Sequence, residues 1–86
     1  MSYIPENLRK IVRHRALRCC EYCLIDEDTV FLSHEIDHII SLKHGGLNTI
    51  KNLALACALC NRYKGTDVGS IFQGQFLRFF NPRIDI

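Results

Sequence analysis

The chain has 86 residues, with 11 Lys or Arg against 9 Asp or Glu, and therefore a formal net charge of +2 at neutral pH. A chain of this length makes one small domain whose apolar core is marginal without a cross-link or a metal. No apolar run reaches the roughly 18 residues of a membrane-spanning helix, and the first residues do not resemble a secretory signal. We therefore expect a single domain over residues 1–86, without a membrane partner, in a reducing, cytoplasmic compartment.

Residues 5–17 are predicted to form an amphipathic helix. Pro5 suits its first turn, and apolar residues recur from there at helical spacing. Basic residues crowd this helix and the turn after it, against the single acid Glu6. The cluster is interpreted either as a phosphate-contacting surface or as an ordinary solvated helix face. Its members are Arg9, Lys10, Arg13, Arg15 and Arg18.

Four of the five cysteines form two Cys-x2-Cys pairs, at positions Cys20, Cys23, Cys57 and Cys60. Two intervening residues let one turn present both sulfurs to the same zinc ion. We predict one structural Zn²⁺ per chain, whose binding supplies folding energy that the small core lacks. Two independent redox motifs, or buried free thiols, are the alternative. Cys19 is either a spare apolar residue or a replacement for Cys20.

Residues 24–56, between the two pairs, must hold a folded insert. An acidic segment, LIDEDTV, leads into the stretch HEIDHIISLKHGG at residues 34–46. Its β-branched residues predict a short strand, which the glycine pair ends. A second short strand or turn is expected in NLALA, then the second cysteine pair and a short helix ending at Gly65. Residues 66–86 are expected to form a strand-like tail.

Asp37 and His38 carry chemistry suited to phosphodiester hydrolysis. A carboxylate oxygen is a hard ligand for Mg²⁺ or Mn²⁺. A histidine with an ordinary pKa of about 6.5 suits general-base catalysis near neutral pH. Because neighbouring residues of a strand point in opposite directions, these two side chains can divide metal binding and proton transfer between them.

The segments CEYC, EIDHII, HGG and KNLALACALCNRYKG together resemble the HNH endonucleases, in particular a zinc-stapled, four-cysteine bacterial branch of that family. The resemblance runs from Ile4 to about Lys64 and continues loosely through FLRFFNPRID. In that branch we expect a longer segment before the aromatic run and more chain after Ile86. The resemblance implies an α+β fold. This is a small ββα-metal (His-Me) finger with an N-terminal helix, a four-cysteine structural zinc site and a core over about residues 4–65.

The resemblance also implies roles for four residues. Asp37 matches the first ligand of the catalytic metal, and His38 matches the general base that activates the attacking water. Asn52 matches the central Asn, whose amide bridges the loop between the strands and orients the base. Asn61 stands where the family often has His as the second metal ligand. Its amide oxygen keeps the site suited to Mg²⁺ or Mn²⁺.

The sequence thus predicts a metal-dependent DNA endonuclease that cuts or nicks phosphodiester bonds. Double-stranded DNA is the expected partner, and the choice between a monomer, a homodimer and a complex with another protein stays open. The expected contacts to nucleic acid are Arg13, Lys43, Arg62 and Lys64. The alternative is a zinc-stapled nucleic-acid-binding module without nuclease activity. A thiol redox protein is a third interpretation, which leaves EIDHII unexplained.

Overall fold

The computed structural model describes residues 4–65, 69–72, 75–78 and 81–85. In this part of the chain the helices and strands follow in the order α1 (Glu6–Arg15), β1 (Glu35–His38), β2 (Leu53–Ala56), α2 (Ala58–Lys64), β3 (Gly69–Phe72) and β4 (Gln75–Arg78). Single turns of 3₁₀-helix stand at η1 (Glu27–Thr29), η2 (Leu42–His44) and η3 (Ile50–Asn52). The predicted α+β fold is confirmed. None of the described helices has the length and apolar character needed to cross a membrane.

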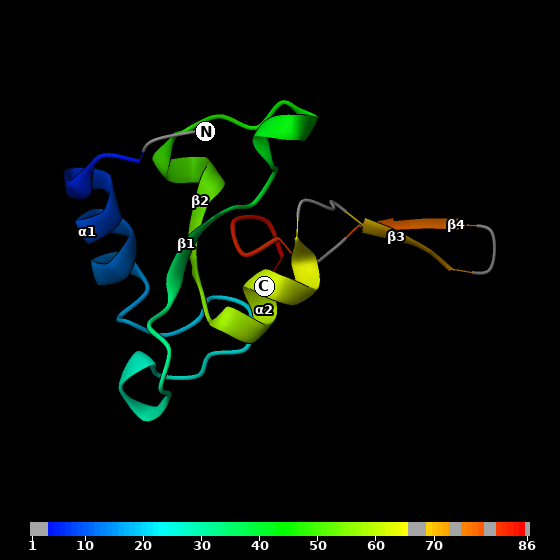
Figure 1. Ribbon diagram of the computed structural model, residues 1–86. Coiled ribbons are helices and arrows are strands. Elements are labelled where there is room, and N and C mark those ends of the chain that lie inside the picture. Colours follow the sequence, from blue (N-terminus) through cyan, green and yellow to red (C-terminus); the bar gives the residue numbers. More distant parts are fainter. Residues whose placement is uncertain (1–3, 66–68, 73–74, 79–80, 86) are drawn as a thin grey trace.

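β1 and β2 form an antiparallel pair, and α2 follows β2 with one residue between them, which gives the predicted ββα order. In the register of the pair, Asp37 lies opposite Ala54 and His38 opposite Leu53. All four residues of β2 are buried, as its continuous apolar sequence predicts for a covered strand. Figure 1 shows α1 on one side of this pair and α2 on the other.

The apolar core lies between α1 and the strand pair. Its buried members come from the residues before α1, from α1 itself and from β2, and they are Ile4, Val12, Leu53 and Leu55. α1 presents an apolar stripe to β2 and η3, which agrees with the helical spacing of its apolar residues. The core therefore anchors β2, and through it the strand that carries Asp37 and His38.

α1 is shorter than the helix predicted over residues 5–17. It starts after Pro5 and ends at Arg15. Leu17 and Arg18 have φ values of 53° and 60°, which lie outside helical geometry. The chain thereby turns sharply from α1 into the first cysteine pair.

The basic residues of α1 and the following turn are largely engaged within the fold. The guanidinium of Arg13 contacts both carboxylate oxygens of Glu27, at 2.8 and 2.6 Å, and the carbonyl oxygen of His34 at 3.0 Å. Glu27 is only 7% exposed, so LIDEDTV is not a simple acidic surface loop. Contacts to backbone or carboxylate groups are also made by Arg9, Arg15 and Arg18. Four of the five residues of the cluster therefore tie α1 and its turn to neighbouring segments, while Lys10 is exposed.

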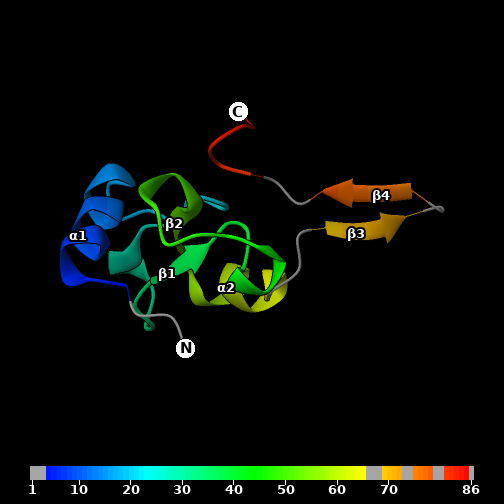
Figure 2. The same cartoon turned by 90° about the horizontal axis from the view of Figure 1, so that it is seen from above.

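β3 and β4 form a second antiparallel pair, within the tail predicted to be strand-like. Figures 1 and 2 show this hairpin extending away from the β1–β2 pair and the two helices. After the hairpin, residues 81–85 form a turn. Arg83 of that turn makes an ion pair with Glu21, which lies in the first cysteine turn. The last described residues are thereby tied back to the first cysteine turn.

Candidate metal centre and active site

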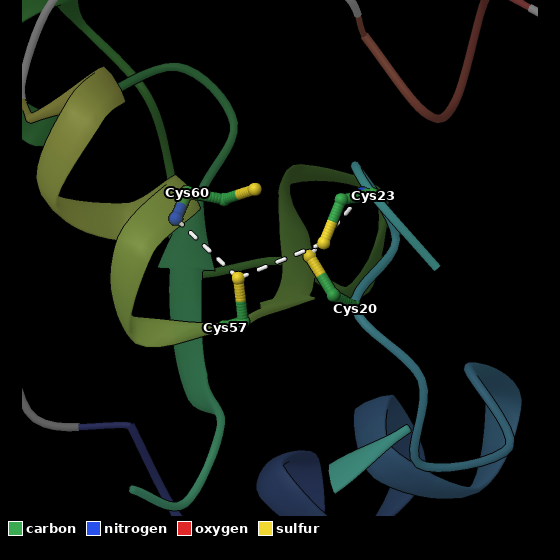
Figure 3. A group of neighbouring side chains, drawn as sticks. All are labelled: Cys20, Cys23, Cys57 and Cys60. Carbon is green, nitrogen blue, oxygen red and sulfur yellow. Dashed lines mark hydrogen bonds between the residues drawn. The ribbon is translucent and has the colours of Figure 1, made fainter. Parts of the chain in front are cut away.

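The four cysteines of the two pairs converge on one point. Cys20 and Cys23 lie on the turn after α1, while Cys57 caps the N-terminus of α2 and Cys60 lies in its first turn (Figure 3). Their four Sγ atoms all lie within 4.8 Å of one another. A tetrahedral zinc with Zn–S bonds of about 2.3 Å needs sulfurs about 3.8 Å apart, and Cys23 Sγ lies 3.7 Å from Cys57 Sγ. The cluster is therefore positioned to bind a metal ion, consistent with zinc.

The backbone around the cluster favours thiolate ligands. The N–H groups of Tyr22 and Cys23 point at Cys20 Sγ from 3.4 Å. Burial alone would raise the pKa of Cys20, but backbone N–H groups, including that of Cys57, lower it to about 7. Burial and the neighbouring sulfurs raise the pKa of Cys60. Four thiolates this close together repel one another, and a divalent metal ion bound between them would supply the compensating charge.

Cys19 lies outside the cluster. Its backbone forms an isolated antiparallel bridge with Asp26, and the group of four ligands contains Cys20 in its place. Of the two roles left open by the sequence, the geometry supports Cys19 as a residue without a ligand function.

One face of β1 meets α2 directly. Glu35 and Asp37 are two residues apart on β1 and share this face. From α2, Asn61 Nδ2 donates a hydrogen bond to Glu35 Oε2 at 2.7 Å, and Lys64 Nζ lies 3.3 Å from Asp37 Oδ2. Asp37 and Asn61, the two predicted ligands of a catalytic metal, therefore stand on facing surfaces of adjacent elements.

The carboxylate of Asp37 is 6% exposed and held on one side. The hydroxyl group of Tyr22 donates to Oδ2 at 2.8 Å, and the ammonium group of Lys64 contacts the same oxygen. Burial raises the pKa of Asp37, while the hydrogen bond from Tyr22 and the charge of Lys64 oppose that rise. Burial and the charge of Asp37 in turn raise the pKa of Tyr22, so its hydroxyl keeps the proton that it donates.

His38, at the end of β1, is held by a residue that the sequence did not single out. Its Nε2 lies 2.5 Å from Oδ1 of Asn48, in the loop between η2 and η3. With this amide oxygen as the acceptor, Nε2 carries the ring proton and Nδ1 keeps its lone pair. An Asn shortly after two glycines is typical of any turn, so no signal in the sequence distinguishes Asn48.

Asn52 bridges the loop between the two strands through its side-chain amide. Its Oδ1 accepts from the N–H of Ile40, and its Nδ2 donates to the carbonyl oxygens of Ile40 and Leu47, each at 2.9 Å. Gly46 passes so close to this point that a Cβ atom there would collide with the Ile40 carbonyl and with the Asn52 amide. The loop therefore needs both the glycine and the amide to keep its shape.

A family model for HNH endonucleases matches residues 20–67. This span contains both cysteine pairs, the β1–β2 pair and α2, and it covers more than half of the chain. The chain belongs to the HNH endonuclease family. No curated protein matches the chain. Membership of the HNH family indicates a nuclease or another nucleic-acid-related function, and HNH domains typically act on DNA.

The four residues predicted to contact nucleic acid differ in their exposure and in their partners within the protein. Lys43, on η2, and Arg62, on α2, are exposed. Arg13 is paired with Glu27. Lys64 is only 8% exposed, and its Nζ atom contacts Asp37 and donates to the carbonyl oxygen of His38 at 2.8 Å. The spacing of charges along the sequence could not reveal these internal partners, because they come from other elements of the fold.

Proposed function

We propose that this chain is a metal-dependent endonuclease that hydrolyses or nicks phosphodiester bonds of double-stranded DNA. The observation that carries the proposal is the placement of Asp37 on β1 against the face of α2 that bears Asn61, with His38 next along the same strand. We further propose that residues 1–86 act as a single domain, with the catalytic core inside residues 4–65.

The donor set on these two elements fits a hard divalent cation. Asp37 offers a carboxylate oxygen. Because Asn61 Nδ2 is turned toward Glu35, Asn61 offers its amide oxygen. Oxygen ligands of this kind suit Mg²⁺ or Mn²⁺. When bound, such a cation supplies stabilisation of the negative charge that develops on the phosphate and the leaving 3′ oxygen.

The other residues have distinct tasks in this proposal. His38 Nδ1 accepts a proton from the attacking water, since Nε2 is engaged by Asn48. Asn52 keeps the loop around the base in shape, and Lys43 and Arg62 bind the DNA backbone as exposed cations. A structural zinc on the four cysteines fixes the start of α2, and Asn61 follows the last of these cysteines directly.

A second function, a zinc-stapled nucleic-acid-binding module without nuclease activity, has one observation in its favour. Asp37 already has a buried cation, Lys64, as its partner. A carboxylate neutralised in this way is stable without a metal ion, as a purely structural residue would be. Activity measurements must therefore decide between the two functions.

The experiment is a plasmid-nicking assay with the zinc-loaded full chain and added Mg²⁺ or Mn²⁺. We expect the parent protein to nick supercoiled DNA and His38→Ala to lose this activity while keeping its zinc and its fold. His44→Ala is the matched control, because His44 is exposed on η2 of the same loop. Undiminished nicking by His38→Ala would refute the mechanism. DNA binding by a parent protein that does not nick would support the binding module.

A further inference from the structure

We propose that Tyr22 is a positioning residue for Asp37, through which the first cysteine turn orients the carboxylate that faces α2. The inference rests on the proposed nuclease function, because it assigns Asp37 to the catalytic metal. The cysteine cluster would then position both proposed ligands of the catalytic metal, Asn61 on α2 and Asp37 on β1.

Tyr22 contacts both the cysteine cluster and the carboxylate of Asp37. It lies between Cys20 and Cys23 in the sequence, and its backbone N–H points at Cys20 Sγ from 3.4 Å. Its side chain reaches β1, where the hydroxyl donates to Asp37 Oδ2 at 2.8 Å. One residue thus connects a proposed zinc ligand to a proposed ligand of the catalytic metal.

The hydrogen bond and the ion pair of the Asp37 carboxylate involve the same one of its two oxygens. Among the described residues, Tyr22 and Lys64 both contact Oδ2, and Lys64 also holds the carbonyl oxygen of His38. Two donors on the same oxygen restrict rotation of the carboxylate and leave Oδ1 as its ligand atom. Hydrogen bonds to a ligating carboxylate typically change metal affinity by about 10- to 100-fold when they are removed.

Tyr22→Phe is the decisive variant, because it removes the hydroxyl group that contacts Asp37 and keeps the aromatic ring. The matched control is Tyr63→Phe on α2, where the side chain is 90% exposed. Binding of Mn²⁺ to the zinc-loaded full chain is measured from the electron paramagnetic resonance signal of free Mn²⁺. Zinc content and thermal unfolding are measured on the same samples.

We expect Tyr22→Phe to bind Mn²⁺ about 10- to 100-fold more weakly than the parent protein, with one zinc per chain retained. The Tyr63→Phe control should bind Mn²⁺ as the parent does. Parent-like Mn²⁺ affinity in Tyr22→Phe would overturn the inference. Loss of zinc from this variant would also overturn it, because Tyr22 would then act on folding and not on Asp37.

Asp37→Ala separates failure of this inference from failure of the proposed function. If the parent protein binds Mn²⁺ and nicks DNA, Asp37→Ala abolishes both, and Tyr22→Phe changes neither, then the nuclease function stands and the positioning role is wrong. If the parent protein neither binds Mn²⁺ nor nicks DNA, both are wrong. Weakened Mn²⁺ binding in Tyr22→Phe, with full loss in Asp37→Ala, supports both.

Discussion

His38 Nε2 lies 2.5 Å from Asn48 Oδ1, which joins the end of β1 to the loop between η2 and η3. Under the proposed function, this contact leaves Nδ1 of His38 as the ring nitrogen that would act as the base. It also makes the orientation of the imidazole depend on the shape of a loop that Asn52 and Gly46 hold together.

Asn48→Ala should therefore slow DNA nicking without changing metal content. Loss of the amide oxygen frees the imidazole to rotate and to change tautomer, and misplacement of a catalytic group can cost about 100-fold in rate. We expect a fall in kcat of about 10- to 100-fold, measured under saturating DNA, with zinc and Mn²⁺ binding unchanged. Asn7→Ala, on the exposed part of α1, is the control. An unaltered kcat in Asn48→Ala would show that His38 does not need this partner.

Under the proposed function, Glu35→Gln should weaken binding of the catalytic metal ion through its effect on Asn61. Glu35 accepts a hydrogen bond from Asn61 Nδ2, and a carboxylate accepts only, whereas a Gln amide can also donate. In the variant the Asn61 amide can turn over and present N–H groups, which cannot bind a cation. We expect lower Mn²⁺ affinity by calorimetry with the zinc-loaded protein.

The double variant Glu35→Gln/Asn61→Asp tests that explanation. A carboxylate at position 61 presents an oxygen in either orientation, so Glu35→Gln should have a smaller effect in the Asn61→Asp background than in the parent protein. Equal effects in both backgrounds would mean that Glu35 acts through its charge alone.

Removal of the structural metal should unfold the domain. Structural zinc contributes about 10–16 kcal/mol in small domains, which exceeds the few kcal/mol that a core of this size supplies. We expect Cys57→Ser, or treatment with a strong chelator, to abolish the helical circular dichroism signal, and added zinc to restore it after chelation. Cys19→Ser should keep both zinc and structure, since Cys19 is outside the cluster. Native circular dichroism in metal-free protein would contradict the structural role.

Glu27→Gln should destabilise the fold at neutral pH by about 1–3 kcal/mol, because it removes a charged partner from Arg13 in a buried setting. Burial alone would raise the pKa of Glu27, but the hydrogen bonds and charge of Arg13, with the His34 N–H, hold it below the ordinary 4.5. The stabilising contribution is therefore complete above about pH 4.5 and is lost as the pH falls through the lower pKa of the folded state.

Urea unfolding of the parent protein and Glu27→Gln at matched pH values checks this prediction. The difference between their free energies of unfolding should be constant near neutral pH and should shrink below pH 4.5. Protonation of the cysteine ligands would lower the free energy of unfolding of both proteins equally, so it cancels in this difference. Asp28→Asn is the control, since the Asp28 side chain is 70% exposed and its pair with Arg18 lies at the surface. A difference that persists in acid would exclude the charge of Glu27 as its source.

Local patterns predicted the parts of the fold that depend on neighbours in the sequence. The Cys-x2-Cys spacing predicted both turns of the cysteine cluster. The apolar run predicted the strand β2, and Gly65 predicted the end of α2. The sequence could not show that Arg13 would meet Glu27, 14 residues later. Charge pairing across the fold depends on tertiary packing, and a local reading treats both residues as surface charges.

The same limit applies to the candidate site. Asp37 and His38 could be singled out because their side-chain chemistry is unusual for a short strand. Their partners Tyr22, Lys64 and Asn48 have ordinary residue types for a turn, a helix end and a loop. Only the packing of the first cysteine turn and of α2 against β1 gives these residues a part in the site.

The position of β1 between the two cysteine pairs sets the order in which the molecule can be assembled. During synthesis the strand with Asp37 and His38 emerges before Cys57 and Cys60, so a metal ion cannot join the two turns until α2 has been made. Closing that loop carries an entropic cost, which metal binding offsets. A newly made chain would therefore remain without a working centre until it had acquired its ion. Under the proposed function, the metal supply of the cell would determine when the chain becomes able to cut DNA.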